Sequence, residues 1–233
     1  PEKFTGVAAS ITDTTLASVS ATSKAVTGSH SMEIQTLAQS QKLKSANFAT
    51  TGTTIGSGTM TIQFGSYSGG TFTLNPDKAA QSITISPNNS SLAGIRDAIN
   101  LADAGVTASI VNDGSGNRLV IASEDTGLSN ALKITTTDAD GNNTDNAGLS
   151  QLVYDASTGG TTNLAETVSA SNATLVIDGI SISKASNKIT DALEGVTLDL
   201  LKTNVGSTTT LNLTRDTASI EGAITGFVKS FND

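Results

Sequence analysis

Apolar and polar residues alternate most clearly in the C-terminal third of the chain, from Ala173 to Lys202. Turn dipeptides interrupt this alternation at Asp178-Gly179, Ser186-Asn187 and Glu194-Gly195. Alternation between turn signals predicts short strands that bury one face. The apolar residues of this segment are Val176, Ile180, Ile182, Ile189, Val196, Leu198 and Leu200. None of these side chains has catalytic chemistry, so the segment is expected to be a scaffold that presents a surface.

A second series of elements is predicted in the middle of the chain. Alternating residues at 60–64 and 72–74 flank a turn at 65–70, which is typical of a hairpin. A short strand at 83–85 precedes a helix that Ser90 or Ser91 can cap and Gly105 ends. The residues that share one face of this helix are Leu92, Ile95, Ala98, Ile99 and Ala102. Strands around Ile110 and Ile121 then flank the turn 112–116, and together these elements indicate an α+β module.

Two stretches rich in Gly and Thr, at 50–58 and 159–164, bracket this module. We interpret them as hinge-like links, so that the chain leaves an outer domain, forms the module and then resumes the outer domain. The predicted domains are residues 1–50 with 165–215 (outer, β-rich), residues 51–164 (inserted, α+β) and residues 216–233 (helical). The fold class is thus mainly β with some α. Residues 137–164 are expected to form a mobile loop with one short anchored piece.

The pattern changes to helical periodicity at Asp216, a plausible N-cap. An apolar stripe follows on one helical face, and it consists of Ile220, Ile224, Phe227, Val228 and Phe231. Two partners fit such a stripe: other helices of the same subunit, or a neighbouring molecule. This stripe is the candidate interaction face. Because the chain begins at Pro1 and ends within the helical pattern, it is expected to be an internal piece of a longer protein.

The amino-acid composition excludes several classes of partner and site. Hydrophobic residues make up 36% of the 233 residues and aromatic residues 3%, which predicts small cores in thin domains. The net charge of −8 repels nucleic acid and anionic lipid, so neither nucleic acid nor a membrane is expected as a partner. No apolar run approaches the roughly 20 residues that span a bilayer. The absence of cysteine excludes disulfides and thiolate metal sites.

Four places in the sequence contain residues that could form a chemical site. His30 is the single histidine and has no nucleophile motif beside it, so it is interpreted as a solvated residue at a strand end. The segment 138–145 lacks the acidic twelfth ligand of a calcium loop. The segment 112–117 lacks the following helix and lysine of a phosphate loop, and Glu124-Asp125 reads as a solvated acidic loop. We therefore assign no catalytic residue, no metal ligand and no cofactor.

Four segments, in order, resemble one family. Residues 28–41, GSHSMEIQTLAQSQ, are similar to a segment of flagellar hook-associated protein 2. Residues 92–123 resemble the hook IN motif of flagellins and cap proteins. Residues 178–202 resemble the second half of the family, and 214–232 resemble the start of its leg helix.

This resemblance implies a secreted, non-enzymatic subunit of a ring at the tip of the bacterial flagellar filament, with β-rich heads on legs that continue as coiled coil. It implies flagellin, further copies of the chain and the hook–filament junction proteins as partners, and in some species host mucin. The alternative is a secreted adhesin module that binds mucin or glycans. A cap protein would continue into long helices after residue 233, whereas an adhesin would start another β domain.

Overall fold

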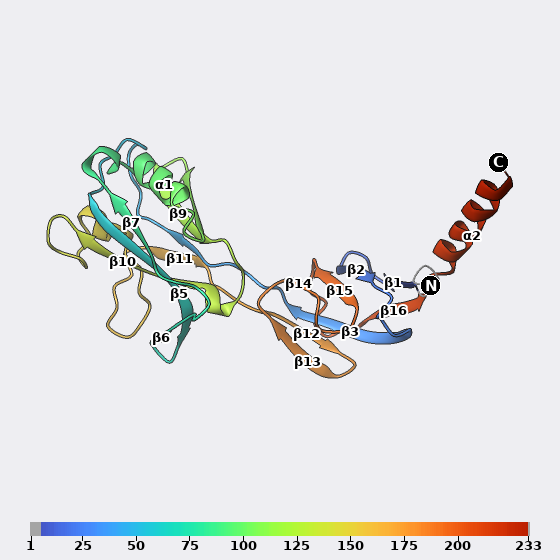
Figure 1. Ribbon diagram of the computed structural model, residues 1–233. Coiled ribbons are helices and arrows are strands. Elements are labelled where there is room, and N and C mark those ends of the chain that lie inside the picture. The colour runs from blue at the N-terminus through green and yellow to red at the C-terminus, as the bar shows by residue number, and fades with distance from the viewer. Residues whose placement is uncertain (1–5, 233) are drawn as a thin grey trace. The chain divides into compact units, whose positions relative to one another are not determined.

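Strands are the main regular secondary structure of the chain. The computed structural model describes residues 6–232, and within that range there are sixteen strands and two α-helices. They divide into two compact units, one formed by residues 1–38 with 172–233 and the other by residues 39–171. The predicted α+β fold, with one β-rich domain inserted into another, is confirmed (Figure 1).

The outer unit contains two antiparallel sheets, with strand orders β1-β16-β3-β12-β13 and β14-β15-β2. The strands are β1 (Val7–Ile11), β2 (Ala17–Ala21), β3 (Gly28–Thr36), β12 (Ala173–Ile177), β13 (Ile180–Lys184), β14 (Lys188–Ile189), β15 (Val196–Leu200) and β16 (Thr209–Arg215). Residues of both sheets share one apolar core, which includes Met32, Leu175 and Leu198. Strand β3 pairs with β12 and β16, so segments from the two ends of the sequence form one sheet.

The buried face of β12 differs from the alternating pattern. Leu175 and Ile177 are buried, whereas Val176 between them is only partly buried. In the edge strand β13, Ile180 is 67% exposed, also unlike the expectation. The run 175–177 is apolar at every position, so the alternation does not fix which face is buried, and a shift by one residue exchanges the faces. The expected burial in β14 and β15 is confirmed for Ile189, Val196, Leu198 and Leu200.

The turn between β12 and β13 is confirmed at Asp178-Gly179. Ile177 pairs with Ile180, so the loop has two residues, and their φ angles are +50° and +82°. Two consecutive positive φ values define the turn that fits the twist of a hairpin, and an Asp-Gly pair adopts it at low cost. This turn places the Asp178 carboxylate beside strand β3.

The inserted unit also contains two antiparallel sheets. Strand β5 pairs with β10, β6 and β7 in one, and the other has the order β11-β4-β9-β8. The strands are β4 (Lys42–Lys44), β5 (Gly58–Ser68), β6 (Thr71–Leu74), β7 (Gln81–Ile85), β8 (Val106–Asn112), β9 (Asn117–Ser123), β10 (Ala131–Asp138) and β11 (Ala165–Val168). Three 3₁₀ segments complete this unit: η2 (Pro87–Asn89), η3 (Leu128–Asn130) and η4 (Gly148–Leu152).

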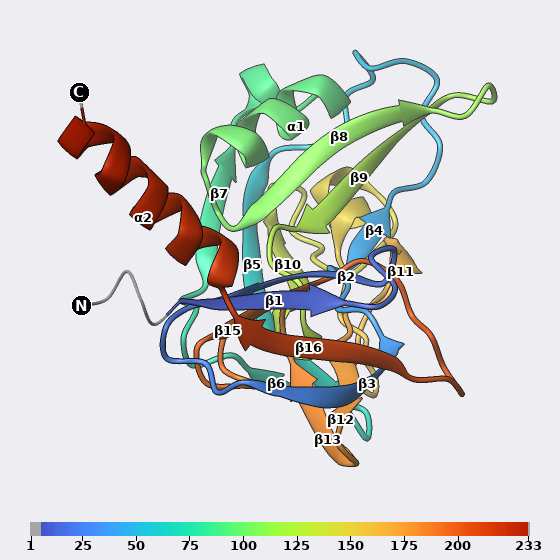
Figure 2. The same ribbon diagram turned by 90° about the vertical axis from the view of Figure 1, so that its right-hand side faces the viewer.

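Helix α1 (Leu92–Leu101) packs on β7 and β8, and Figure 2 shows it beside the long β8–β9 hairpin. Its cap is confirmed at Ser91, whose Oγ accepts a hydrogen bond from Gly94 N at 3.1 Å. Leu92, Ile95 and Ile99 are fully buried, as the helical spacing predicts. The helix anchors the core of this unit, which also includes Leu43, Ile62 and Ile121.

The boundaries between the units lie elsewhere than we expected from the Gly/Thr-rich stretches. Residues 39–50 and 165–171 belong to the inserted unit. The reason is strand pairing: β4 pairs with β9 and with β11, which joins both segments to the second sheet of that unit. The chain therefore passes between the units at 38–39 and at 171–172.

The interpretation of 50–58 and 159–164 as hinge-like links is wrong. Ile55 is 6% exposed and Leu164 is 1% exposed, and both belong to the core of the inserted unit. The carbonyls of Thr53 and Thr51 accept hydrogen bonds from the first amides of α1, Leu92 N and Ala93 N. Small polar residues here make close backbone contacts inside one unit instead of connecting two.

More of the segment 137–164 is anchored than the sequence suggested. Leu149, Leu152 and Tyr154 lie in the core. Tyr154 exchanges two backbone hydrogen bonds with Ile134 of β10, at 2.8 and 2.9 Å. The polar composition hides these anchors, because the buried residues are spaced irregularly between exposed Asp, Asn and Gly residues.

Candidate interaction surface

The candidate interaction face lies on the C-terminal helix. Helix α2 spans Thr217–Asn232, directly after Asp216, which confirms the helix expected from the periodicity (Figure 1). Ile224 is 50% exposed and Val228 is 49% exposed, which leaves two β-branched side chains available to a partner. The side chains of Ile220, Phe227 and Phe231 lie outside the described part of the structure. The periodicity of the sequence remains the basis for placing all five on one face.

Four further apolar side chains are exposed on the outer unit. Val26 is 75% exposed, Val205 69%, Ile180 67% and Leu201 58%. Val26, Leu201 and Val205 were not predicted to be exposed; Val26 and Val205 lie in polar segments, and Leu201 directly follows the buried Leu200. Single exposed apolar residues are common on folded proteins, so they do not by themselves identify a contact surface.

The His30 side chain contacts the Asp178 carboxylate, whereas the sequence predicts a solvated histidine at a strand end. Its Nδ1 lies 2.6 Å from Oδ2 of Asp178, and the other carboxylate oxygen of Asp178 accepts a hydrogen bond from Ser31 N at 2.8 Å. The His30 contact and the Ser31 amide hold the pKa of Asp178 below its usual value. This pair connects the β12–β13 turn to β3, so its role is structural.

The acidic loop after β10 is built around Asp138, a buried carboxylate. Asp138 Oδ2 accepts a hydrogen bond from Ser150 N at 2.8 Å. Two short-range hydrogen bonds follow in the same loop: Asp140 N donates to Asp138 Oδ1 at 3.4 Å, and Asn142 N donates to Asp140 Oδ1 at 2.9 Å. Within residues 6–232, no group of three or more acidic or histidine side chains is arranged to hold a metal ion.

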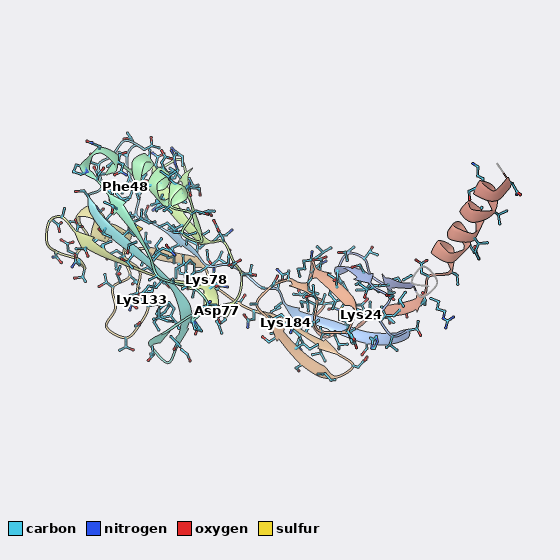
Figure 3. The ribbon with its side chains drawn as sticks, viewed as in Figure 1. Lys24, Phe48, Asp77, Lys78, Lys133 and Lys184 are labelled. Carbon is cyan, nitrogen blue, oxygen red and sulfur yellow. The ribbon has the colours of Figure 1, made fainter. Side chains whose placement is uncertain are left out.

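The remaining polar segments are turns held by ion pairs. Asp113 accepts hydrogen bonds from Ser115 Oγ at 2.6 Å and from Arg118 Nε at 2.7 Å, and these bonds lower the pKa of its carboxyl. Asp125 binds Lys78 Nζ at 2.6 Å, and this ammonium lies 4.2 Å from the centre of the Phe64 ring. Figure 3 labels Lys78 on the inserted unit. The arrangement supports neither a phosphate loop at 112–117 nor a paired-carboxylate site at 124–125.

None of the helices in residues 6–232 has both the length and the apolar character needed to cross a membrane.

Family models match three parts of the chain. The N-terminal model of flagellar hook-associated protein 2 matches residues 1–41, the flagellin hook IN motif matches residues 68–125, and the C-terminal model of flagellar hook-associated protein 2 matches residues 170–233. The four segments that carry the resemblance lie within these three matches, in the same order.

Relatives match most of the chain. The B-type flagellar hook-associated protein 2 of Pseudomonas aeruginosa is 34% identical over 221 residues, which cover 91% of this chain and 44% of that protein. The flagellar hook-associated protein 2 of Escherichia coli K12 is 40% identical over 179 residues, which cover 76% of this chain and 35% of that protein. The chain thus spans less than half the length of these relatives.

Solved structures show the same architecture. The D1-D2-D3 domains of the flagellar cap protein FliD from Escherichia coli superpose with a TM-score of 0.84 at 35% identity, and the match covers 99% of this chain and 72% of that one. The D2-D3 domains of the same protein give a TM-score of 0.77 at 36% identity and cover 91% of this chain and all of that one. On these matches in sequence and structure, the chain belongs to the flagellar hook-associated protein 2 family.

Proposed function

We propose that this chain forms the head domains and the start of a leg of a cap subunit at the distal end of the bacterial flagellar filament. In this position the subunit promotes flagellin polymerisation and prevents the loss of exported flagellin. The observation that carries the proposal is the match to the flagellar cap protein of Escherichia coli over 99% of this chain.

The physical form of the chain suits this role. Two β-rich units are built on separate apolar cores, and a helix follows the last strand of the outer unit. The function is carried by shape and contact, and the proposal assigns no catalysis, no metal and no cofactor to the chain. The site of action is extracellular, at the filament tip.

The proposed partners are flagellin, further copies of the chain in a ring, and the hook–filament junction proteins that precede the filament. The matches do not support the alternative of a secreted adhesin, so host mucin is not part of the proposal. The proposed contact with a neighbouring subunit or with flagellin uses the stripe Ile220, Ile224, Phe227, Val228 and Phe231 on α2. Exposure of Ile224 and Val228 is the structural support for this face.

The test uses a normally motile bacterial strain from which the cap gene has been deleted. The full gene that contains this chain is expected to restore filament growth, measured by electron microscopy and swimming. The double substitution Ile224→Asp with Val228→Asp is expected to abolish growth, because two charges on the apolar face block its burial against a partner. Gly226→Asp is the control, since it adds charge on the opposite side of α2 where a new side chain meets no atom within 4 Å.

The outcomes separate the two parts of the proposal. If the unmodified gene leaves the cells without filaments, the cap function is wrong. If the gene restores filaments and the double variant does so equally well, the cap function stands and the interaction face on α2 is wrong.

A further inference from the structure

A pocket of about 200 Å³ lies within the inserted unit. Its walls include Gln41, Tyr67, Leu128, Tyr154 and Glu166. The chain contains two tyrosines, and both line this pocket. In a chain with 3% aromatic residues, this concentration of aromatic surface is unusual.

The two tyrosine rings meet edge to face beside the pocket, and Tyr154 is 5% exposed. Their centroids are 6.3 Å apart and their planes meet at 88°. Tyr67 is held in place because its hydroxyl donates to Leu132 O at 3.1 Å and its ring packs on Phe72 at 4.8 Å. Aromatic rings carry partial negative charge on their faces, and such faces attract cations.

A carboxylate completes the pocket. Glu166 accepts a hydrogen bond from Gln41 Nε2 at 2.5 Å, and Gln41 is 1% exposed, with its own oxygen bound by Leu132 N at 2.6 Å. The buried amide therefore orients the carboxylate of Glu166, which is itself an exposed residue. None of the residues that line the pocket is a lysine, arginine or histidine, and Glu166 has no ion-pair partner among the described residues.

The electrostatic character of the pocket is negative. Burial raises the pKa of Tyr67 and of Tyr154; the Asp155 and Glu166 carboxylates raise the pKa of Tyr67 further, and Glu166 raises that of Tyr154. Both tyrosines are thus neutral at physiological pH and keep their hydroxyl protons. Glu166 then supplies the formal charge of the pocket.

In the same unit, two lysine ammonium groups each contact one aromatic ring and one carboxylate. Lys78 Nζ lies 4.2 Å from the centre of the Phe64 ring and binds Asp125, and Lys133 Nζ lies 5.6 Å from the centre of the Phe72 ring and binds Asp155 at 2.7 Å. Figure 3 labels both lysines. The pocket offers two rings and a carboxylate in the same combination, without a lysine of its own.

We propose that this pocket binds an organic cation of side-chain size, the alkylammonium of a lysine or the guanidinium of an arginine, presented by a partner protein. Its volume is below the range of pockets that enclose whole drug-sized ligands, and it suits the end of one side chain. The rings contribute cation–π attraction, and the carboxylate pairs with the charge.

Tyrosine fluorescence reports on this pocket directly, because the chain has no tryptophan and both tyrosines are in its walls. The purified chain is titrated with n-butylammonium for the lysine arm, methylguanidinium for the arginine arm, and n-butanol as a neutral probe of similar shape. We expect at least one cation to give a saturable change and to bind about tenfold or more tightly than n-butanol. Equal binding of n-butanol, or no saturable change with either cation, would overturn the proposal.

Two pairs of variants assign the effect to named groups. Glu166→Gln is expected to weaken cation binding about tenfold, whereas Glu124→Gln, an exposed carboxylate outside the pocket, leaves it unchanged. Tyr154→Phe keeps the ring and is expected to retain binding within about twofold, and Tyr154→Leu loses the ring face and most of the affinity. Circular dichroism verifies that each variant is folded. Unchanged affinity in folded Glu166→Gln and Tyr154→Leu contradicts the site.

Discussion

The side-chain amide of Asn187 binds both backbone polar groups of Ala38. Its Oδ1 accepts from Ala38 N at 2.7 Å and its Nδ2 donates to Ala38 O at 3.0 Å. Ala38 is 4% exposed and follows the end of β3, where no neighbouring strand supplies these bonds. Buried backbone groups need partners, so Asn187 takes the place of a strand at the last residue of the outer unit before the chain enters the inserted unit.

Removal of this amide should destabilise the outer unit. Asn187→Ala leaves the N–H and C=O of Ala38 without their partners, at a cost of about 2–4 kcal/mol in the free energy of unfolding. Urea unfolding followed by far-UV circular dichroism measures the loss. Ser186→Ala is the control, since Ser186 makes one exposed hydrogen bond to Lys188 N, and a change within about 0.5 kcal/mol is expected. Equal stability of the two variants would mean that Asn187 has no such role.

Gly148 allows the acidic loop after β10 to close. Its φ is +54°, and a Cβ at this position would lie 2.5 Å from Asp138 Oδ2 and 2.8 Å from Asp140 Oδ2. Gly148→Ala should therefore add a steric clash to the strain of a left-handed backbone, and we expect a loss of about 2–4 kcal/mol. The unfolding of the inserted unit can be followed by tyrosine fluorescence, because Tyr67 and Tyr154 both belong to it.

The matched control for this substitution is Gly141→Ala. Gly141 has φ +88°, and a Cβ there would meet no atom within 4 Å. It should show the backbone strain alone, about 1–2 kcal/mol. If the two variants lose the same stability, the close approach of Gly148 to the two carboxylates is not a constraint on the fold.

Substitution of Ile55 tests whether residues 50–58 are packed in the inserted unit or form a link between domains. Ile55 is 6% exposed in the core of the inserted unit, so Ile55→Ala should cost about 2–5 kcal/mol. Leu101→Ala in the same unit removes a side chain that is 88% exposed, and it should change stability by less than about 0.5 kcal/mol. Tyrosine fluorescence during urea unfolding compares them. A small effect for Ile55→Ala would restore the interpretation of residues 50–58 as a link.

The sequence predicts the elements that have a strong local signal. Ser91 and the spacing of Leu92, Ile95 and Ile99 define α1, and the Asp178-Gly179 dipeptide defines the β12–β13 turn. In both cases the information lies within a few residues of the element. The family resemblance is also visible in the sequence, because each of its four segments keeps its motif in one continuous stretch.

Features that depend on distant contacts were not predicted from the sequence. The membership of β4 in the inserted unit is set by its pairing with β9, which lies far along the chain. The same holds for the contact of His30 with Asp178 and for the pocket formed by Tyr67, Tyr154 and Glu166. The sequence shows the type of each of these residues, but it does not show which distant residue each one contacts.

The pair of His30 and Asp178 should make the stability of the outer unit depend on pH. The contact with His30, with the Ser31 amide, holds the pKa of Asp178 below its usual 3.8 in the folded chain. A carboxyl whose pKa is lower in the folded state contributes stability above its unfolded pKa, and this contribution is lost as the pH falls through the folded value. The variant Asp178→Asn removes the charge and still tolerates the left-handed turn conformation.

Asp178→Asn should therefore lower the midpoint of thermal unfolding at pH 7, and the difference from the unmodified chain should shrink as the pH falls below 3.8. Calorimetry at pH 7, 5 and 3 measures this difference. Asp97→Asn, which removes an exposed carboxylate on α1 of the other unit, should leave the difference near zero at each pH. A midpoint deficit for Asp178→Asn that is the same at pH 3 as at pH 7 would show that the turn geometry, and not the carboxylate charge, stabilises this part of the sheet.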